Sequence, residues 1–150
     1  MATVATIGYQ GATVRTFLDA LRDERIELLV DVRAVAMSRR PGFAKRALAA
    51  NLEEAGIGYL HLRDLGTPAD GRAAARAGRH DEMRTIFREQ LATPAAQAAL
   101  ATLADIVRSG RRVALLCFEA DPTHCHRSLV AAALQALVPA EVRHLTPLED

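Results

Sequence analysis

The chain of 150 residues has no tryptophan, only two cysteines, and few aromatic residues, which make up 4% of it. No segment approaches 18 uninterrupted apolar residues, which argues against an apolar membrane-spanning helix. The first residues contain neither a basic stretch nor a long apolar stretch, so we expect a cytoplasmic protein with no membrane partner. A net charge of +1 excludes a global electrostatic bias, so any affinity for nucleic acid must come from a local patch.

The small number of cysteines also bears on the chemistry. In a reducing compartment, two cysteines favour thiol, metal or redox chemistry over a structural disulfide. A chain of this length fits one domain over residues 1–150, and such a domain can bury about two thirds of its unfolded surface without cross-links.

Short apolar runs rich in valine and isoleucine alternate with stretches of helical periodicity. Thr13 and Thr93-Pro94 are typical helix starts, and Gly56 is a typical helix end. The pattern predicts strands over residues 3–8, 27–32, 57–62 and 112–116 and near 142, with helices over 14–21, 44–55, 83–91 and 94–109 and from 122 onward. We therefore expect an α/β fold, a single domain whose mainly parallel sheet of about five strands is flanked by helices on both faces.

The interval 66–78 breaks this alternation. It consists mostly of alanine, glycine and arginine, including Arg72 and Arg76, and has few side chains for packing. We expect a mobile loop or a weak helix over one face.

The carboxyl edge of the predicted sheet should hold the ligand, because helix N-termini and loops converge there in open α/β sheets. Polar or small residues follow four of the predicted strands at this edge. We expect supporting roles in the site for Gly8, Tyr9, Asp31 and His61.

The segment 117–127 follows a predicted buried strand and holds both cysteines and two of the five histidines. Asp121 and Pro122 predict an N-cap and a first helical residue, which would place Cys125 in the first helical turn. There the helix dipole, together with His126 and Arg127, would favour a thiolate, so Cys125 is a candidate nucleophile or redox thiol. The alternative is a small core residue in a packed helix.

The other candidates in this segment also have two interpretations each. Cys117 is either a nucleophile or the last core residue of its strand. Glu119 is either a general base or a second cap for helix amides. His126 is either an acid–base group or a core imidazole bonded to a backbone carbonyl.

The same segment could instead ligate zinc through Cys117, Cys125 and either His124 or His126, with Glu119 or Asp31 as a fourth ligand. The spacing differs from the standard zinc motifs, and three adjacent residues cannot all point inward. We therefore expect no metal or cofactor and keep zinc as an alternative.

Residues 33–46 carry five positive charges and no acid. In a functional interpretation Arg33, Arg39 and Arg40 bind an anion together with Arg127, and Phe43 stacks on a base. The alternatives are a solvated loop and an ion pair between Asp31 and Arg33 that organises it. The expected partner is an anionic small molecule or a nucleic acid.

These motifs resemble the bacterial and archaeal family called domain of unknown function 488, and the resemblance covers nearly the whole chain. The residues that carry it are Thr6-Ile7-Gly8-Tyr9, Leu29-Val30-Asp31-Val32-Arg33, Ser38-Arg39, Phe43, Gly56-Ile57, Tyr59-Leu60-His61-Leu62, Leu65-Gly66, and the block of Cys117, Glu119, Asp121-Pro122 and Cys125-His126-Arg127. The resemblance implies a small intracellular α/β domain with these positions as its signature. A fainter similarity to rhodanese-type domains covers residues 29–33, the strand before Cys117, and Arg127-Ser128, although the loop here is longer and not glycine-rich.

The leading hypothesis from the sequence is an enzyme that acts on a phosphate-bearing or other anionic substrate. Cys117 or Cys125 would be the nucleophile, with Glu119 and His126 as acid–base groups. Such an enzyme would be a cysteine-dependent transferase or hydrolase. The competing hypotheses are a non-catalytic nucleic-acid-binding module and a zinc-binding protein.

Overall fold

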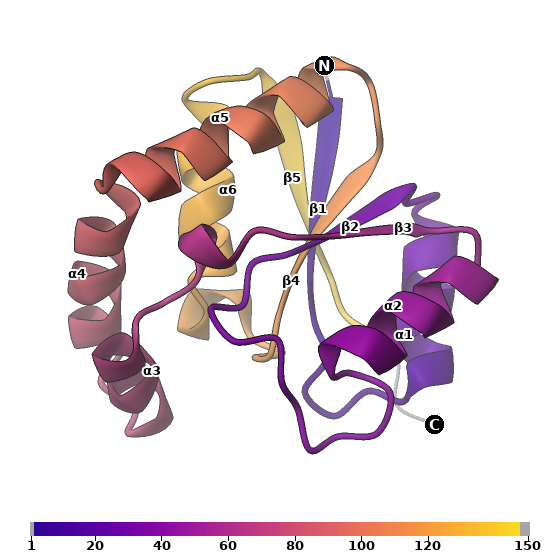
Figure 1. Ribbon diagram of the computed structural model, residues 1–150, viewed down its shortest axis with the longest axis horizontal. Helices are drawn as coiled ribbons and strands as arrows, with labels where there is room; N and C mark the ends of the chain where they lie inside the picture. Colours follow the sequence, from indigo (N-terminus) through magenta and orange to yellow (C-terminus); the bar gives the residue numbers. More distant parts are fainter. Residues whose placement is uncertain (1, 148–150) are drawn as a thin grey trace.

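The structure, a computed structural model, describes residues 2–147 and contains one sheet of five parallel strands (Figure 1). The order across the sheet is β3-β2-β4-β1-β5. The strands are β1 (Ala2–Gly8), β2 (Leu28–Asp31), β3 (Gly58–His61), β4 (Val113–Cys117) and β5 (Ala140–Leu145). The helices are α1 (Val14–Asp23), α2 (Lys45–Glu54), α3 (Ala69–Arg76), α4 (His80–Leu91), α5 (Pro94–Arg108) and α6 (Arg127–Gln135), with short 3-10 turns η1 (Arg63–Leu65) and η2 (Pro122–His124).

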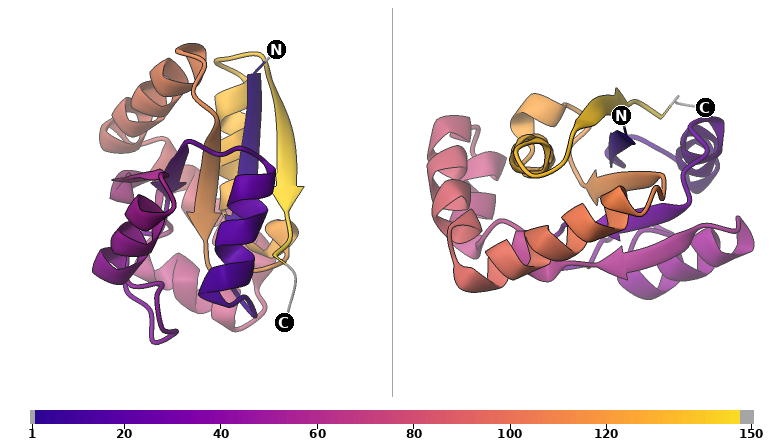
Figure 2. Two further views of the ribbon diagram at one scale, coloured as in Figure 1. Left: turned by 90° about the vertical axis from the view of Figure 1, so that its right-hand side faces the viewer. Right: turned by 90° about the horizontal axis from the view of Figure 1, so that it is seen from above.

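Helices cover both faces of the sheet, which confirms the predicted architecture (Figure 2). Successive residues of β4 point to opposite faces: Val113 and Leu115 pack against α4, α5 and α6, whereas Ala114 and Leu116 pack against α1 and α2. A strand buried on both faces must be apolar at consecutive positions, and all five residues of β4 are buried.

Local signals in the sequence set most helix boundaries. Thr13 caps α1 through a capping box in which its side chain accepts from the Thr16 amide at 3.1 Å. Thr93 caps α5 directly before Pro94, as the sequence predicts. Gly56 follows α2 with a φ of 75°, a conformation that favours glycine.

The sheet order places the carboxyl ends of β1 and β4 side by side at a topological switch point. The chain leaves β1 through α1 toward β2, and it leaves β4 through α6 over the other face toward β5. Gly8 pairs with Cys117 in the register of the two strands. Ligands of open α/β sheets bind in the crevice that such divergent connections leave.

Most of the interval 66–78 forms helix α3 (Ala69–Arg76), which is the second of the two predicted alternatives, a helix over one face. Small residues let α3 pack closely against α4. A Cβ on Gly71 would collide with Thr67 and meet Ile86 of α4 at 3.1 Å. Ala74 is fully buried. The scarcity of large side chains therefore allows a close contact between α3 and α4, where we had inferred that little could pack.

Among residues 2–147, no helix is long and apolar enough to cross a membrane.

Candidate functional site

A cavity of about 830 Å³ opens at the carboxyl edge of the sheet, where the sequence places the ligand. Its walls come from three regions that are distant in the sequence. These are the segments after β1 and β2, the helices α3 and α4, and the loop between β4 and α6, which we call the Cys loop (residues 117–126).

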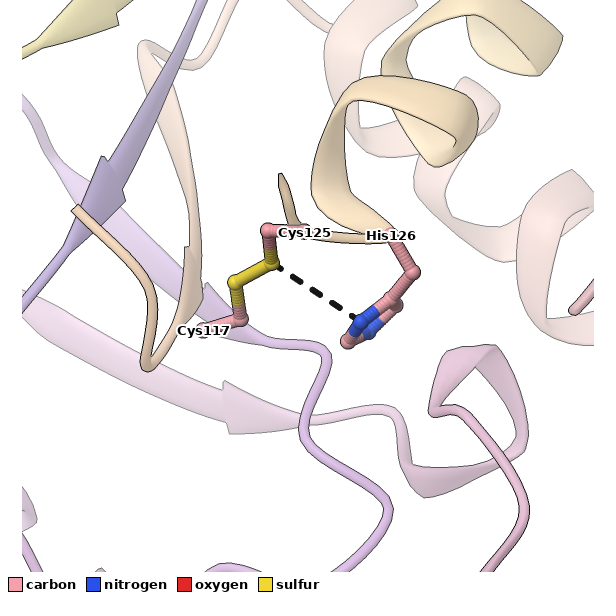
Figure 3. Close-up of side chains that lie close together, drawn as sticks. All are labelled: Cys117, Cys125 and His126. Carbon is pink, nitrogen blue, oxygen red and sulfur yellow. Dashed lines mark hydrogen bonds between the residues drawn. A yellow bond between two sulfur atoms is a disulfide. The ribbon is translucent and has the colours of Figure 1, made fainter. Parts of the chain in front are cut away.

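Both cysteines lie at this cavity and are joined by a disulfide (Figure 3). Cys117 is the last residue of β4, and Cys125 lies two residues before α6. Each is 2% exposed. The two cysteines of the sequence favour thiol, metal or redox chemistry over a structural disulfide, and the sequence does not predict that they pair with each other.

The predicted helix start at Asp121 and Pro122 is wrong in its extent. Asp121 does accept from the Thr123 amide at 2.9 Å, but only the 3-10 turn η2 follows. Cys125 then has an extended backbone, with a φ of −128°, and α6 begins at Arg127. This break lets Cys125 reach Cys117, which a continuous helix from Pro122 would not allow.

His126 is buried and keeps a fixed orientation. Its Nε2 lies 2.7 Å from the carbonyl oxygen of Val32. Because a carbonyl oxygen only accepts hydrogen bonds, Nε2 carries the proton and Nδ1 keeps its lone pair. The Nδ1 atom lies 3.8 Å from Cys125 Sγ (Figure 3). Burial lowers the pKa of His126 to about 4, so the ring is neutral and supplies no positive charge to Cys125, contrary to the sequence-based expectation.

Arg127 is 0% exposed and does not line the cavity. Its guanidinium donates to Thr6 Oγ1 at 3.1 Å, to the carbonyl oxygen of Glu119, and to that of Ala120 at 3.1 Å. We had expected Arg127 to clamp an anion, but the structure gives it partners within the protein, and it holds the Cys loop in shape. Burial lowers the pKa of Arg127 to about 10, so it stays protonated at neutral pH.

Arg127 also contacts both sulfur atoms. Its Nη1 lies 3.4 Å from Cys117 Sγ, and its backbone amide lies 3.5 Å from Cys125 Sγ. N–H groups directed at sulfur stabilise a thiolate more than a thiol. In the reduced protein, these two N–H groups can therefore donate hydrogen bonds to the thiolates of Cys117 and Cys125.

Glu119 lies over Cys117 at the cavity wall. Its Oε2 is 3.5 Å from Cys117 Sγ, within reach of a thiol hydrogen bond in the reduced protein. Burial raises the pKa of Glu119, while its own backbone amide and the charge of Arg127 oppose this shift. The carboxyl group is thus placed to exchange a proton with Cys117.

Several backbone amides of the Cys loop are used by acceptors within the protein. Four of them donate within the protein: Ala120 to Gln10 Oε1, Thr123 to Asp121 Oδ1, His124 to the Asp121 carbonyl and Cys125 to the Pro122 carbonyl. A nucleophile that attacks a phosphate group depends on such amides to bind the oxygens. These four amides are therefore not free to bind the oxygens of an anion.

Asp31 and Arg33 form a buried ion pair, the alternative that the sequence left open. Arg33 Nη2 donates to Asp31 Oδ2 at 2.7 Å and Nε donates to Oδ1 at 2.9 Å. Hydrogen bonds and the charge of Asp31 raise the pKa of Arg33 against the effect of burial. Tyr59 donates to Asp31 at 2.6 Å, and His61 contacts the Arg33 carbonyl at 2.7 Å, so His61 and the ion pair organise the segment after β2.

Tyr9 and Gly8 support the same edge. Arg33 Nη1 donates to Tyr9 Oη at 3.3 Å. A Cβ on Gly8 would collide with the Glu119 carbonyl, so glycine permits the close approach of the Cys loop to β1.

The predicted basic run does not face the cavity as a unit. Arg39 is exposed and Arg40 donates to the Ala12 carbonyl at 2.6 Å, and neither lines the cavity. Phe43 is 1% exposed and stacks on Tyr9 at 4.7 Å, so it is not available to stack on a base as we had expected.

The basic residues that do line the cavity lie mainly on α3, α4 and the Cys loop. Arg72 and Arg76 are four residues apart on α3, and the rings of His80 and His124 stack at 4.1 Å. The sequence alone could not predict that these two arginines line the cavity, because their position depends on how α3 packs. A spacing of four within a helical interpretation of 66–78 was the available signal.

Fold and site together define a doubly wound α/β protein with a cysteine pair and a buried histidine at its switch point. The family described as Domain of unknown function DUF488 matches residues 13–134, and the chain belongs to it. The matched region includes the Cys loop and α3. No curated protein and no solved structure matches the chain significantly.

Proposed function

We propose that this protein is a thiol–disulfide exchange enzyme that acts on anionic substrates. The observation that carries the proposal is that one residue, Arg127, directs N–H groups at both Cys117 Sγ and Cys125 Sγ, beside an open cavity. Donors to both sulfurs favour a pair that is reduced and oxidised reversibly, since they stabilise the thiolate that exchange requires.

The exchange begins at Cys117 in the reduced protein. The Glu119 carboxylate takes the proton of the Cys117 thiol, and the thiolate attacks one sulfur of a substrate disulfide. The substrate S–S bond breaks, a mixed disulfide with Cys117 forms, and the leaving thiolate takes the proton from Glu119.

Cys125 completes the reaction. The Cys125 sulfur attacks Cys117 Sγ, the mixed disulfide breaks, and the Cys117–Cys125 disulfide forms. The proton of the Cys125 thiol passes to the second substrate sulfur, which leaves as a thiol. The two electrons that reduce the substrate come from the two cysteines. An external thiol reductant then restores the dithiol.

The preference for anions rests on the charged side chains of the cavity. Arg72 and Arg76 lie at its wall, and Glu119 is the one acidic residue among its described lining residues. Two guanidinium groups at the cavity wall, of which that of Arg72 also donates to the Thr67 carbonyl at 2.9 Å, attract carboxylate or phosphate groups of a substrate. A phosphoryl-transfer mechanism has less support, because four amides of the Cys loop donate within the protein.

The proposed setting is the cytoplasm, where reducing thiol pools would keep the pair in its dithiol form at rest. Nucleic-acid binding stays a prediction. Its basis in the run 33–46 is reduced to the exposed Arg39, Lys45 and Arg46. Arg33 is buried in its pair with Asp31, and Arg40 donates to the Ala12 carbonyl.

The test compares two disulfides of opposite charge. The reduced protein is mixed with glutathione disulfide, which is anionic, or with cystamine, which is cationic, and thiol loss is followed by quenched alkylation and mass spectrometry. We expect faster oxidation by glutathione disulfide at low ionic strength, and accumulation of the mixed disulfide in Cys125→Ser.

Arginine variants give the matched controls. Arg76→Gln should slow the reaction with glutathione disulfide several-fold and leave cystamine unchanged, whereas Arg46→Gln, on the exposed surface of α2 outside the cavity, should change neither. Equal rates with both disulfides would contradict the anion preference. Oxidation no faster than that of a free model thiol would contradict the exchange function.

A further inference from the structure

We propose that the reduced Cys117, Cys125 and His126 form a zinc-binding site beside the cavity. The two Sγ atoms and a ring nitrogen of His126 lie within 4.8 Å of one another, and all three residues are buried. This inference goes beyond disulfide exchange, which leaves the imidazole without a role. Metal binding does not rest on the proposed exchange reaction.

The orientation of His126 is that of a metal ligand with its supporting hydrogen bond in place. Ligating histidines generally donate their other ring N–H to a carboxylate or a backbone carbonyl, which fixes the tautomer. Here Nε2 donates to the Val32 carbonyl at 2.7 Å, and Nδ1 faces the sulfurs with its lone pair. His126 is 8% exposed, and in the disulfide form Cys125 has no thiol proton to offer Nδ1.

The spacing suits a tetrahedral ion. Zinc bond lengths of about 2.3 Å to sulfur and 2.0–2.1 Å to nitrogen place ligand atoms roughly 3.5–3.8 Å apart. Cys125 Sγ and His126 Nδ1 are already 3.8 Å apart. The two sulfurs are bonded in the oxidised protein and separate on reduction, which opens the space between them for the ion.

A rotation of the Glu119 side chain would supply the fourth ligand, since its carboxylate lies beside Cys117 but outside the group of ligand atoms that are all within 4.8 Å of one another. Glu119 Oε2 lies 3.5 Å from Cys117 Sγ on the cavity side. Asp31, the other carboxylate that the sequence suggested, is bound by Arg33 and Tyr59. The charges of two thiolates and the Glu119 carboxylate are balanced by Zn²⁺ and the buried Arg127, so the site as a whole is neutral.

The metal-bound and disulfide states exclude each other. Zinc is held by the thiolate electron pairs, and oxidation converts those two sulfurs to one S–S bond with the loss of two electrons. A substrate disulfide that accepts these electrons would therefore release the ion. The same cysteines would then couple the redox state of the cell to zinc occupancy.

Cobalt substitution tests this site on the wild-type chain. The metal-free protein is reduced under anaerobic conditions and titrated with Co²⁺. We expect one ion per chain, sulfur-to-cobalt charge-transfer absorption in the near ultraviolet, visible bands typical of tetrahedral cobalt, and loss of all bands when Zn²⁺ is added. The disulfide form of the same protein should bind none.

Variants identify the ligands. Cys117→Ser and Cys125→Ser should each weaken binding at least tenfold, as should His126→Ala, while His124→Ala, an exposed histidine two residues away, should bind like the wild type. Circular dichroism checks that each variant is folded, and the comparison of reduced with oxidised wild type needs no variant.

Several outcomes would overturn the proposal. These are the absence of sulfur-to-cobalt absorption in the reduced wild type, equal binding by the oxidised protein, or unchanged binding in the folded cysteine variants. Failure of metal binding with fast oxidation by glutathione disulfide would overturn the zinc site alone. Metal binding without that oxidation would overturn the exchange function alone.

Discussion

Replacing Arg127 by methionine should destabilise the fold by about 2 kcal/mol, even though methionine suits a buried position. The guanidinium donates to three oxygen atoms, on Thr6, Glu119 and Ala120. Hydrogen bonds from a charged donor contribute at least about 1.5 kcal/mol each, so their loss costs roughly 4–5 kcal/mol. Burial of the charged guanidinium is itself unfavourable and lowers the pKa of Arg127 to about 10. Methionine avoids this desolvation cost, which offsets about half of the loss.

Urea unfolding of the reduced proteins measures this change without a contribution from the disulfide. Arg22→Met is the matched control, because Arg22 forms an exposed ion pair with Asp19 at 3.6 Å, and its loss should cost less than about 0.5 kcal/mol. Arg127→Met should also lower the alkylation rate of Cys117 at neutral pH, because the Cys117 thiolate loses the Nη1 donor that stabilises it. Stability equal to or above that of the wild type would refute the assigned role of Arg127.

Substitutions at three further positions test which residues stabilise the site and the fold. Asp31→Ala should cost about 3–5 kcal/mol in urea unfolding, because it leaves the Arg33 guanidinium buried without a counter-charge, and a loss below 1 kcal/mol would contradict this. Gly8→Ala should cost about 1–3 kcal/mol, because its Cβ displaces the Glu119 carbonyl, and an unchanged unfolding midpoint would show that the loop adapts freely. Thr13→Ala should cost about 1 kcal/mol through loss of the α1 cap, whereas Thr13→Ser should retain most of it.

The sequence predicted the features that local chemistry decides. Apolar periodicity gave the α/β class and both covered faces, and Thr13 and Pro94 marked two helix starts correctly. Asp121 and Pro122 also have the cap chemistry of a helix start, but tertiary contacts end that turn. Cys125 contacts Cys117 and His126 contacts the Val32 carbonyl, and neither contact has a local signal.

Charged residues were the least predictable part of the site. An arginine in a sequence is normally assigned to the surface, yet Arg127 is fully buried because the carbonyls of a folded loop surround it. Arg72 and Arg76 reach the cavity only because glycine and alanine let α3 pack closely on α4. Both outcomes depend on packing between segments that are far apart in the chain.

Equilibration of the protein in glutathione redox buffers tests the central claim most directly, namely that Cys117 and Cys125 form a reversible pair at the cavity. The two redox states are trapped by acid and alkylation and counted by mass spectrometry. We expect one two-electron transition with a midpoint above about −300 mV, the range of labile disulfides, and its complete loss in Cys117→Ser and Cys125→Ser. A chain that stays fully reduced, or forms only mixed disulfides with glutathione across the whole range, would contradict the account.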